Sequence, residues 1–432
     1  MLMNIFIAIL ILGLIIFIHE LGHFLLAKAN GITVTEFSLG MGPRLISFVK
    51  GETRYSLKIF PIGGSCMMLG EDEDIEDEGA FNKKGVWARF SVIFAGAFFN
   101  FILAFVLAVV VIGAIGFDYP DVTSAPEGSA IYEAGLREGD RITKLNGKKI
   151  HFGREIDMYL FFDPVNENPI EVTYERDGKT LEATIYPKRL PSFYKLGFGY
   201  NGGMGPLEVH GVEMDFPFYE AGIKAGDIIK GINGTPIESG DDLVNYLNEN
   251  PLTGETLNIK YLRGQEELEV EVTPRLVENS YSLGNFYNIY REKSSPFETV
   301  KYSFFELRFN ILNAVESLKY MISGKASLNQ ISGPVGIVSL VDNIVDQTEK
   351  EGAGIVLLNL ANFAIMLSAN LGVINLLPFP ALDGGRLVFI IIEAIRKKPI
   401  SKDKEAMVHF VGIVLLMMLM VVVLYNDIRK LF

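Results

Sequence analysis

Cysteine is almost absent from this sequence, because Cys66 is the only one among 432 residues. A disulfide framework and a zinc site built from cysteines are therefore excluded. Basic side chains are also in the minority, with 39 Lys and Arg against 52 Asp and Glu and a net charge of -13. Since a surface that binds nucleic acid must be basic to contact phosphates, we expect no nucleic-acid partner. Part of the acidity is local, because seven acids stand in the run 71–78.

Charged residues are nearly missing from four long stretches, although the sequence as a whole is 21% charged. These stretches are residues 4–27, 91–117, 352–382 and 407–425. A helix that crosses a bilayer needs about 20 mostly apolar residues, so each stretch is long enough. The first has neither the basic start nor the cleavage site of a signal peptide, and we interpret it as a retained helix. The pattern predicts a multi-pass α-helical membrane protein with four transmembrane helices.

Lysine and arginine gather on one side of these predicted spans. Eight of them lie in the segment 28–90 and five in the loop 394–405. Positive residues near the ends of spans remain in the cytoplasm, whereas acids such as the run 71–78 contribute little to orientation. Residues 28–90 and 394–405 are therefore predicted to be cytoplasmic. The region 118–350 and both termini should face the outer side.

The outer region contains a duplication. The segment AGLREGD at 134–140 recurs as AGIKAGD at 221–227, and Asn146-Gly147 recurs as Asn233-Gly234 at the same offset. A constant offset predicts two copies of one domain, 118–195 and 196–280. Each copy reads as a short helix, a Gly-Asp turn and alternating strands joined by a hairpin turn, and it resembles an α/β PDZ domain. Peptide binding by strand addition, screening of substrates and a spacer role all stay open.

The first apolar stretch ends in an ionisable motif, His19-Glu20-Leu21-Gly22-His23. On a helix, His19 and His23 share one face a turn apart, so both imidazoles can bind one metal ion. Glu20 stands where it can accept a proton from metal-bound water, as in the HExxH pattern of zinc hydrolases. Chance recurrence of a short motif is the alternative. However, an ionisable residue in a spanning helix costs about 3 kcal/mol and indicates a function.

Zinc hydrolases need a third protein ligand and an open position for water. Asp383 is the best candidate for the third ligand. It follows the third apolar stretch, where Pro378 and Pro380 interrupt the helix and two glycines permit close backbone approach. The predicted topology places Asp383 and the HExxH motif at the cytoplasmic ends of their spans. Asp383 as an ordinary helix-terminal acid is one alternative. The other histidines are His409 on the fourth span, a weaker candidate ligand, and His151 and His210 in the repeats.

Together these motifs resemble the site-2 protease family of intramembrane zinc metalloproteases. The match covers most of the chain and includes HELGH at 19–23, LDGG at 382–385, and the segments 37–43, 61–64, 68–71 and 331–337. The tandem PDZ-like insert narrows this resemblance to the regulator of sigma-E protease type within the family. The resemblance implies Zn2+ on His19, His23 and Asp383, with Glu20 as general base. It also implies a substrate cleft shaped by Asn100, Asn370, Asn375, Pro378 and Pro380.

The resemblance also implies what the protein does. Members of the family cleave transmembrane helices, usually after another protease has removed the substrate's outer domain. We therefore expect single-span membrane proteins as substrates, such as a pre-cut anti-sigma factor or remnant signal peptides, in regulated intramembrane proteolysis linked to a stress response. The expected location is the bacterial inner membrane, with the PDZ-like domains and both termini in the periplasm. Three positions, Ala97, Ser65 and Arg386, depart from the family pattern and affect the expected cleft shape.

Two further segments have predicted roles. Thr33–Ser38 and Arg54–Phe60 read as strands around a Gly-rich bend, which predicts a membrane-associated β-hairpin region (about 31–70) on the cytoplasmic side. This hairpin either pairs with an unwound substrate as an added strand or is only a surface element. Residues 296–325 carry apolar residues at helical spacing and predict an amphipathic helix within the outer-face segment 281–350. That helix either packs against the spans or gates substrate entry.

Two other functions fit parts of the sequence. A membrane-anchored PDZ scaffold without catalysis would explain the repeats, but it has no need for ionisable groups inside a span. A zinc transporter would need further polar ligands along the spans, and the sequence lacks them. The leading prediction is therefore an intramembrane zinc endopeptidase. Residues 1–117 and 351–432 would carry the two halves of its active site.

Overall fold

A computed structural model describes residues 2–71, 73–200, 202–284, 286–288, 290–325, 333–398 and 400–431 of the chain. Residues 331 and 332, which begin the motif 331–337, lie outside the described residues. The chain divides into two compact units. One unit holds Met1–Tyr119, His151–Phe162 and Ile289–Phe432, and the other holds Pro120–Ile150 and Asp163–Asn288.

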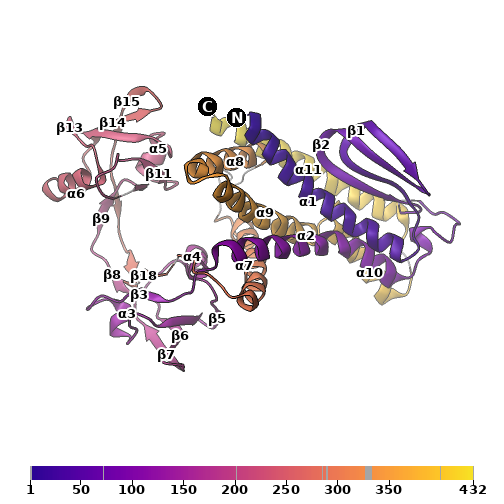
Figure 1. The fold of residues 1–432 in the computed structure, drawn as a ribbon, viewed down its shortest axis with the longest axis horizontal. Coiled ribbons are helices and arrows are strands. Elements are labelled where there is room, and N and C mark those ends of the chain that lie inside the picture. Colours follow the sequence, from indigo (N-terminus) through magenta and orange to yellow (C-terminus); the bar gives the residue numbers. More distant parts are fainter. Residues whose placement is uncertain are drawn as a thin grey trace. The chain divides into compact units, whose positions relative to one another are not determined.

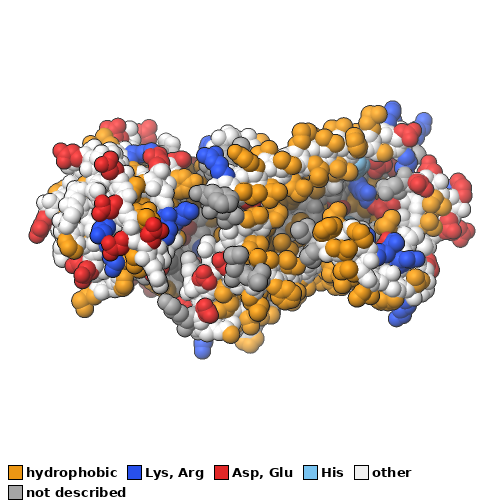
Figure 2. All heavy atoms as spheres, turned by 90° about the horizontal axis from the view of Figure 1, so that it is seen from above, with side chains coloured by type: hydrophobic (Ala, Val, Ile, Leu, Met, Phe, Trp, Pro, Cys, Tyr) orange, Lys and Arg blue, Asp and Glu red, His pale blue; other side chains and the backbone are white. Residues whose placement is uncertain are grey.

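Four helices of the first unit are long and apolar enough to cross a membrane (Figure 1). They are α1 (Leu2–Ala29), α2 (Val86–Ile115), α9 (Ala353–Asn375) and α11 (Lys402–Leu431). Figure 2 shows many hydrophobic side chains on the surface of the unit that carries these helices. An extended apolar surface of this kind fits contact with lipid rather than water. The four predicted spans are therefore confirmed as helices of suitable length and composition.

Small residues allow α1 and α2 to approach each other closely. A Cβ atom added at Gly22 of α1 would lie 2.4 Å from the carbonyl O of Ala95 on α2. Helices in membranes associate through such close backbone packing, because lipid offers no hydrophobic driving force between them. Further along α2, Ala104 and Ala108 are fully buried in a cluster with Ala369 of α9. α2 thus packs against both α1, which carries the HExxH motif, and α9.

The segment between the first two spans forms a curled antiparallel pair of long strands, β1 (Val34–Lys50) and β2 (Thr53–Met68). The second predicted strand lies within β2 and the first begins one residue before β1, but the predicted Gly-rich bend between them is wrong. Gly40 and Gly42 take positive φ angles of 85° and 86°, which lets β1 curl and continue through this stretch. The turn comes later, at residues 51–52. Phe37 pairs with both Tyr55 and Cys66, so the first part of β1 has a neighbour on each side.

A buried carboxylate fastens this sheet. Glu36 is 6% exposed and accepts hydrogen bonds from Arg44 Nε at 2.9 Å, Arg44 Nη2 at 2.8 Å and Ser56 Oγ at 2.6 Å. The hydrogen bonds from Arg44 and Ser56 lower the pKa of Glu36 to about 2. Hydrogen bonds to an ionised group are roughly twice as strong as neutral ones. Glu36 therefore links the early part of β1 to its later part and to β2.

The predicted helix over 296–325 is confirmed as α7 (Pro296–Ile322), but its buried face differs from the apolar one expected. The buried residues are mostly polar, namely Thr299, Ser303, Glu306, Asn310 and Ala314. In contrast, Phe297 and Phe304 are 80% and 58% exposed. This inversion fits a helix beside lipid, because polar groups then find partners only inside the protein. α7 packs against α2 and α9, as one of its two predicted roles requires.

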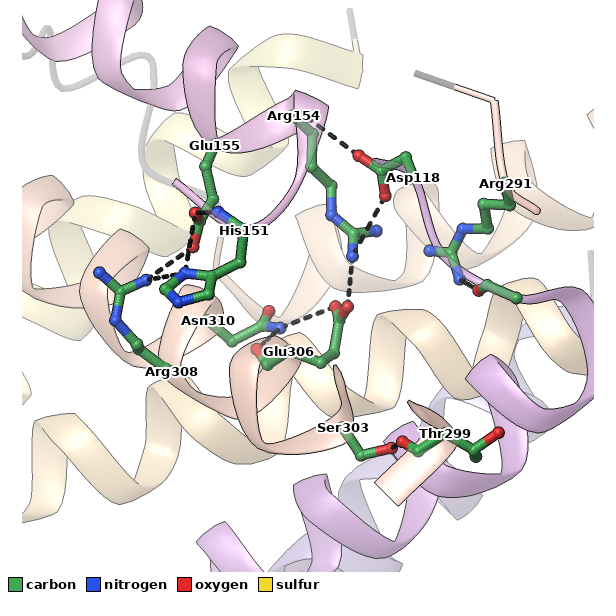
Figure 3. A network of polar contacts seen from close by, with 11 residues as sticks. Asp118, His151, Arg154, Glu155, Arg291, Thr299, Ser303, Glu306, Arg308 and Asn310 are labelled. Carbon is green, nitrogen blue, oxygen red and sulfur yellow. Dashed lines mark hydrogen bonds and ion pairs between the residues drawn. The ribbon is translucent and has the colours of Figure 1, made fainter. Parts of the chain in front are cut away.

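The polar face of α7 forms an ion-pair network with α4 (Gly153–Phe162) and the residues after α2 (Figure 3). Arg154 pairs with Glu306 and also lies 3.6 Å from the carboxylate of Asp118. Next to this pair, Arg308 donates a hydrogen bond of 2.8 Å to Glu155. The three acids Asp118, Glu155 and Glu306 are at most 3% exposed. α4 therefore belongs to the first unit, which carries the four candidate spans, although its sequence lies inside the first repeat copy.

Both repeat copies form a four-stranded sheet of the same order. The first uses β4 (Arg141–Leu145), β5 (Lys148–Lys149), β6 (Ile170–Arg176) and β7 (Lys179–Ile185) in the order β5-β4-β6-β7. The second uses β12 (Ile228–Ile232), β13 (Thr235–Pro236), β14 (Leu257–Arg263) and β15 (Glu266–Val272) in the order β13-β12-β14-β15. Arg176 pairs with Asp140 at 2.7 Å, and Arg263 pairs with Asp227 at the same distance. The duplication is therefore present in the structure as well as the sequence.

The other α-helices and strands of the described residues are shorter than the four candidate spans. The helices are α3 (Ala130–Glu133), α5 (Pro217–Glu220), α6 (Gly240–Glu249), α8 (Pro334–Thr348) and α10 (Asp383–Arg396). The strands are β3 (Val122–Ser124), β8 (Lys188–Arg189), β9 (Phe193–Lys195), β10 (Phe198–Tyr200), β11 (Val209–Val212), β16 (Arg275–Val277), β17 (Tyr281–Ser282) and β18 (Phe286–Tyr287). β17 pairs with β8 and β18 pairs with β3. Residues that follow the second copy thus add strand pairings to the first.

Candidate active site

Three side chains that are far apart in the sequence converge at the cytoplasmic end predicted for α1. His19 and His23 lie one turn apart on α1, and their Nε2 atoms are 3.2 Å from each other. Oδ2 of Asp383 lies 3.2 Å from Nε2 of His19 and 3.3 Å from Nε2 of His23. Among the described residues, these three form the group whose donor atoms all lie within 4.8 Å of one another. The arrangement can hold one metal ion.

The loop before α10 brings Asp383 to this position. α9 ends at Asn375, and Asp383 is the first residue of α10. The loop between them folds back over the first turn of α10, so that a Cβ atom at Gly384 would lie 2.1 Å from the carbonyl O of Leu377. A Cβ atom at Gly385 would lie 2.5 Å from the carbonyl O of Phe379. Only glycine fits this approach, which explains why two glycines directly follow the aspartate.

The hydrogen bonds of the imidazoles fit metal binding through Nε2. Nδ1 of His23 lies 2.9 Å from the carbonyl O of Val92, which can only accept, so the ring proton is on Nδ1. Nδ1 of His19 lies 3.2 Å from the amide of Asn100 and 3.4 Å from that of Asn375. Oδ1 of Asn100 is buried without a partner. If this amide is turned, Oδ1 accepts the Nδ1 proton of His19 and both buried groups are satisfied.

A cation would complete this arrangement. With the Asn100 amide turned, both ring protons are on Nδ1, and two Nε2 lone pairs and the Asp383 carboxylate face each other without a proton between them. Oδ2 of Asp383 is itself buried and lacks a hydrogen-bond donor. Two imidazoles and one carboxylate are a donor set that catalytic zinc sites use, with a fourth position left for water. The residues present therefore fit a zinc ion.

Two glycines make room for the motif on α1. A Cβ atom at Gly96 of α2 would lie 2.3 Å from Nε2 of His23, so α2 crosses directly over the imidazoles. A Cβ atom at Gly64 of β2 would lie 2.8 Å from Cγ of Glu20. The glutamate is therefore held between α1 and the sheet. The sequence marks Gly96 only as one member of the small-residue run 95–97, and its role depends on the crossing of the two helices.

A cavity of about 1140 Å3 opens beside this group. It is lined by Glu20, His19, His23 and Asp383, by residues 64–68 of β2, and by charged residues farther out. Among the charged residues, Arg89 pairs with Glu393 at 2.5 Å, and Arg386 pairs with Glu71, the first acid of the run 71–78. Cys66 also lines the cavity, but burial raises the pKa of its thiol, so it is not a candidate nucleophile.

The other residues singled out from the sequence lie as follows. Asn100 and Asn375 contact the far side of the His19 ring, and Oδ1 of Asn370 is buried. Neither these asparagines nor Pro378 and Pro380 are among the described residues that line the cavity. Ser65 and Arg386, two of the departures from the family pattern, do line it, whereas Ala97 is buried in α2. His151 belongs to the network around α7, and His210 lies on β11.

Comparison with known proteins identifies the family. The chain matches the model of peptidase family M50 over residues 7–419. The regulator of sigma-W protease RasP of Bacillus subtilis is 34% identical, over 98% of this chain and 98% of the relative. A zinc metalloprotease RasP of Geobacillus kaustophilus is 33% identical over 98% and 97%, and a putative zinc metalloprotease of Clostridium acetobutylicum is 29% identical over the same shares. The chain therefore belongs to peptidase family M50, the site-2 protease family, and is a zinc metalloprotease.

Proposed function

We propose that the chain is an intramembrane endopeptidase that holds Zn2+ on His19, His23 and Asp383 and cleaves transmembrane segments of single-span membrane proteins. The observation that carries the proposal is the convergence of these three donors within 4.8 Å of one another. Two of them lie on a helix long and apolar enough to span a membrane. Ionisable side chains in a spanning helix are costly, so their presence indicates a function. A bound cation would offset part of that cost.

Each residue around the group has a role in this reaction. When bound, zinc makes water acidic enough to supply hydroxide near neutral pH. Glu20, which lines the same cavity, takes the proton of the attacking water and delivers it to the leaving amine. With its amide turned, Oδ1 of Asn100 accepts the Nδ1 proton of His19, and the carbonyl of Val92 accepts that of His23. These contacts keep each imidazole in the tautomer that leaves Nε2 available to the metal.

The strand segment 64–68 presents the substrate. A helix hides its peptide carbonyls in its own hydrogen bonds, so it must be unwound before a carbonyl can be attacked. Residues 64–68 line the cavity, and β1 is the strand partner described for them. The unwound part of the substrate pairs with this segment as an added strand. Such pairing satisfies backbone groups that find no partner in lipid.

The candidate spans and the relatives support the proposed substrate class. The relative from Bacillus subtilis is named a regulator of sigma-W protease, which supports a substrate that controls a sigma factor. A pre-cut anti-sigma factor is therefore the first candidate substrate, and remnant signal peptides are the second. The distribution of Lys and Arg supports an active site on the cytoplasmic side of the inner membrane. The two PDZ-like copies then lie outside the cytoplasm and screen or bind the outer part of the substrate.

A co-expression assay tests this function. Tagged single-span proteins, with and without their outer domains, are expressed with the wild-type chain, with Glu20→Gln and with Glu249→Gln, a control at the end of α6. We expect cleavage of shortened substrates by the wild type and the control, and none by Glu20→Gln. Cleavage by Glu20→Gln at the wild-type rate would contradict the assigned role of Glu20. Binding of substrates without cleavage by any variant would instead favour a PDZ scaffold.

A further inference from the structure

A histidine of the last span contacts the loop that carries Asp383. His409 lies on α11 and does not belong to the metal-binding group found among the described residues. Its Nδ1 instead lies 2.9 Å from the backbone N of Ala381, two residues before Asp383. A backbone N–H group can only donate, so Nδ1 of His409 is the acceptor. The neutral ring therefore carries its proton on Nε2.

Ala381 adopts a conformation that needs such support. Its φ is 76°, in the left-handed region that favours glycine over residues with a Cβ atom. A residue other than glycine stays in this region only when the surrounding structure holds it there. The hydrogen bond to His409 is the contact that fixes the N–H of this peptide unit. The direction of the chain as it enters α10, and with it the place of Asp383, depends on this peptide.

A second contact from α11 holds the same loop. Gly412 follows His409 by one helical turn, and a Cβ atom there would lie 2.4 Å from Cβ of Pro380. Gly384 and Gly385 meet the loop on the other side, against the carbonyl groups of Leu377 and Phe379. The loop is therefore fixed between the first turn of α10 and one face of α11.

The rest of α11 makes His409 stand out. Only 6% of the apolar 18-residue stretch of α11 is buried inside the protein. Neighbours of His409 such as Phe410 and Val411 are 66% and 53% exposed. Packing alone would be served by an apolar side chain at position 409. A polar ring in a spanning helix is costly, so its presence indicates a specific role.

We propose that His409 is a positioning residue that sets the geometry of Asp383 through the backbone of Ala381. The inference rests on the proposed role of Asp383 as a metal ligand. Groups that contact and orient a metal ligand without binding the metal themselves change metal affinity by about 10- to 100-fold when they are removed. Loss of the acceptor at position 409 should therefore weaken zinc binding, although His409 does not itself touch the metal.

The test compares three variants of the full chain in detergent. His409→Phe keeps a ring but removes the acceptor, His409→Asn places Oδ1 near the position of Nδ1, and Phe410→Ala changes an exposed neighbour on α11. Zinc content is measured after dialysis against a graded series of chelator concentrations, and kcat and KM are measured on one substrate. We expect His409→Phe to lose zinc at about 10-fold lower chelator concentration, with a lower kcat and unchanged KM. We expect His409→Asn to recover most of the zinc retention and Phe410→Ala to match the wild type.

Two further variants keep the outcome interpretable. Gly412→Ala displaces the loop from the second contact and should also weaken zinc retention, which supplies the test if His409→Phe does not accumulate. Asp383→Ala distinguishes the inference from the function on which it rests. If Asp383→Ala loses zinc but His409→Phe retains it like the wild type, the positioning role is wrong and the metal site stands. If His409→Phe does not accumulate, zinc retention by Gly412→Ala leads to the same conclusion. If Asp383→Ala retains zinc, the metal site itself is wrong and the role of His409 falls with it.

Discussion

Asn100 on α2 lies directly behind the His19 ring, with its amide 3.2 Å from Nδ1 of the imidazole. Asn100 is 0% exposed, and its Oδ1 finds a partner when it accepts the Nδ1 proton. The sequence suggests Asn100 only as part of a substrate cleft. The contact assigns it instead to the orientation of a candidate metal ligand, because it holds His19 with Nε2 toward Asp383.

This contact predicts different effects for two substitutions of Asn100. Asn100→Leu removes the acceptor and should weaken zinc binding about 10- to 100-fold. Asn100→Asp provides a carboxylate acceptor for the same ring proton and should retain zinc. Chelator competition monitored by zinc content measures both. Equal zinc retention by Asn100→Leu and the wild type would show that the amide does not orient His19.

The crossing of α2 over the motif predicts a position-specific effect of one methyl group. Gly96→Ala would place Cβ 2.3 Å from Nε2 of His23 and should abolish both zinc retention and cleavage. Gly113→Ala on the same helix is the matched control, because its Cβ would meet Thr299 Cγ2 at an ordinary 3.6 Å. Both changes raise helix propensity equally. Similar activity of the two variants would argue against the tight crossing at Gly96.

The pKa of Glu36 predicts a pH dependence of the β1–β2 sheet. Its folded-state pKa is about 2, below the ordinary value of 4.5, because Arg44 and Ser56 stabilise the carboxylate. The stabilisation is therefore complete above pH 4.5, declines as the pH falls and is lost below about pH 2. Glu36→Gln should lower the thermal midpoint at pH 6 and flatten its fall between pH 6 and pH 3. Thermal unfolding in detergent measures this, with Glu52→Gln at the exposed turn as the control that should follow the wild type.

The network in Figure 3 predicts that Arg154 attaches α4 to α7 within the first unit. Arg154→Met leaves Asp118 and Glu306 buried without their cation, and such a loss costs about 3–5 kcal/mol. We expect a lower thermal midpoint for this variant. The repeat supplies the control, since Asp241 occupies the corresponding place on α6 of the second copy and is exposed there. Unfolding of Asp241→Asn should be unchanged, and an unchanged Arg154→Met would contradict the attachment.

Features that depend on local periodicity or on a short motif could be predicted from the sequence. The four spans, the duplication and the helix at α7 follow from runs and spacings of residues, and they are present. The pairing of His19 with His23 follows from helical geometry alone. Asp383 could be placed near them because the prolines and glycines around it require a backbone that is not a plain helix.

Features that depend on how distant elements meet could not be predicted. The buried polar face of α7 reverses the usual rule, because Arg154, which pairs with the buried Glu306, comes from α4, a distant part of the sequence. The contacts of Asn100 with His19 and of His409 with Ala381 join residues on different helices. The strand through Gly40 and Gly42 curls instead of turning, since its pairing with β2 continues past the glycines. Each of these needs the tertiary structure before it can be stated.

Elemental analysis of the purified chain shows whether His19, His23 and Asp383 hold zinc. We expect close to one zinc ion per chain in the wild type and in Glu20→Gln, which keeps all three proposed ligands but should not cleave. We also expect loss of the zinc in Asp383→Ala, measured by mass spectrometry of the metal after chelator dialysis, while Asp346→Ala on α8 retains it. Full zinc content in Asp383→Ala, or its absence from wild-type protein that cleaves substrate, would contradict the account.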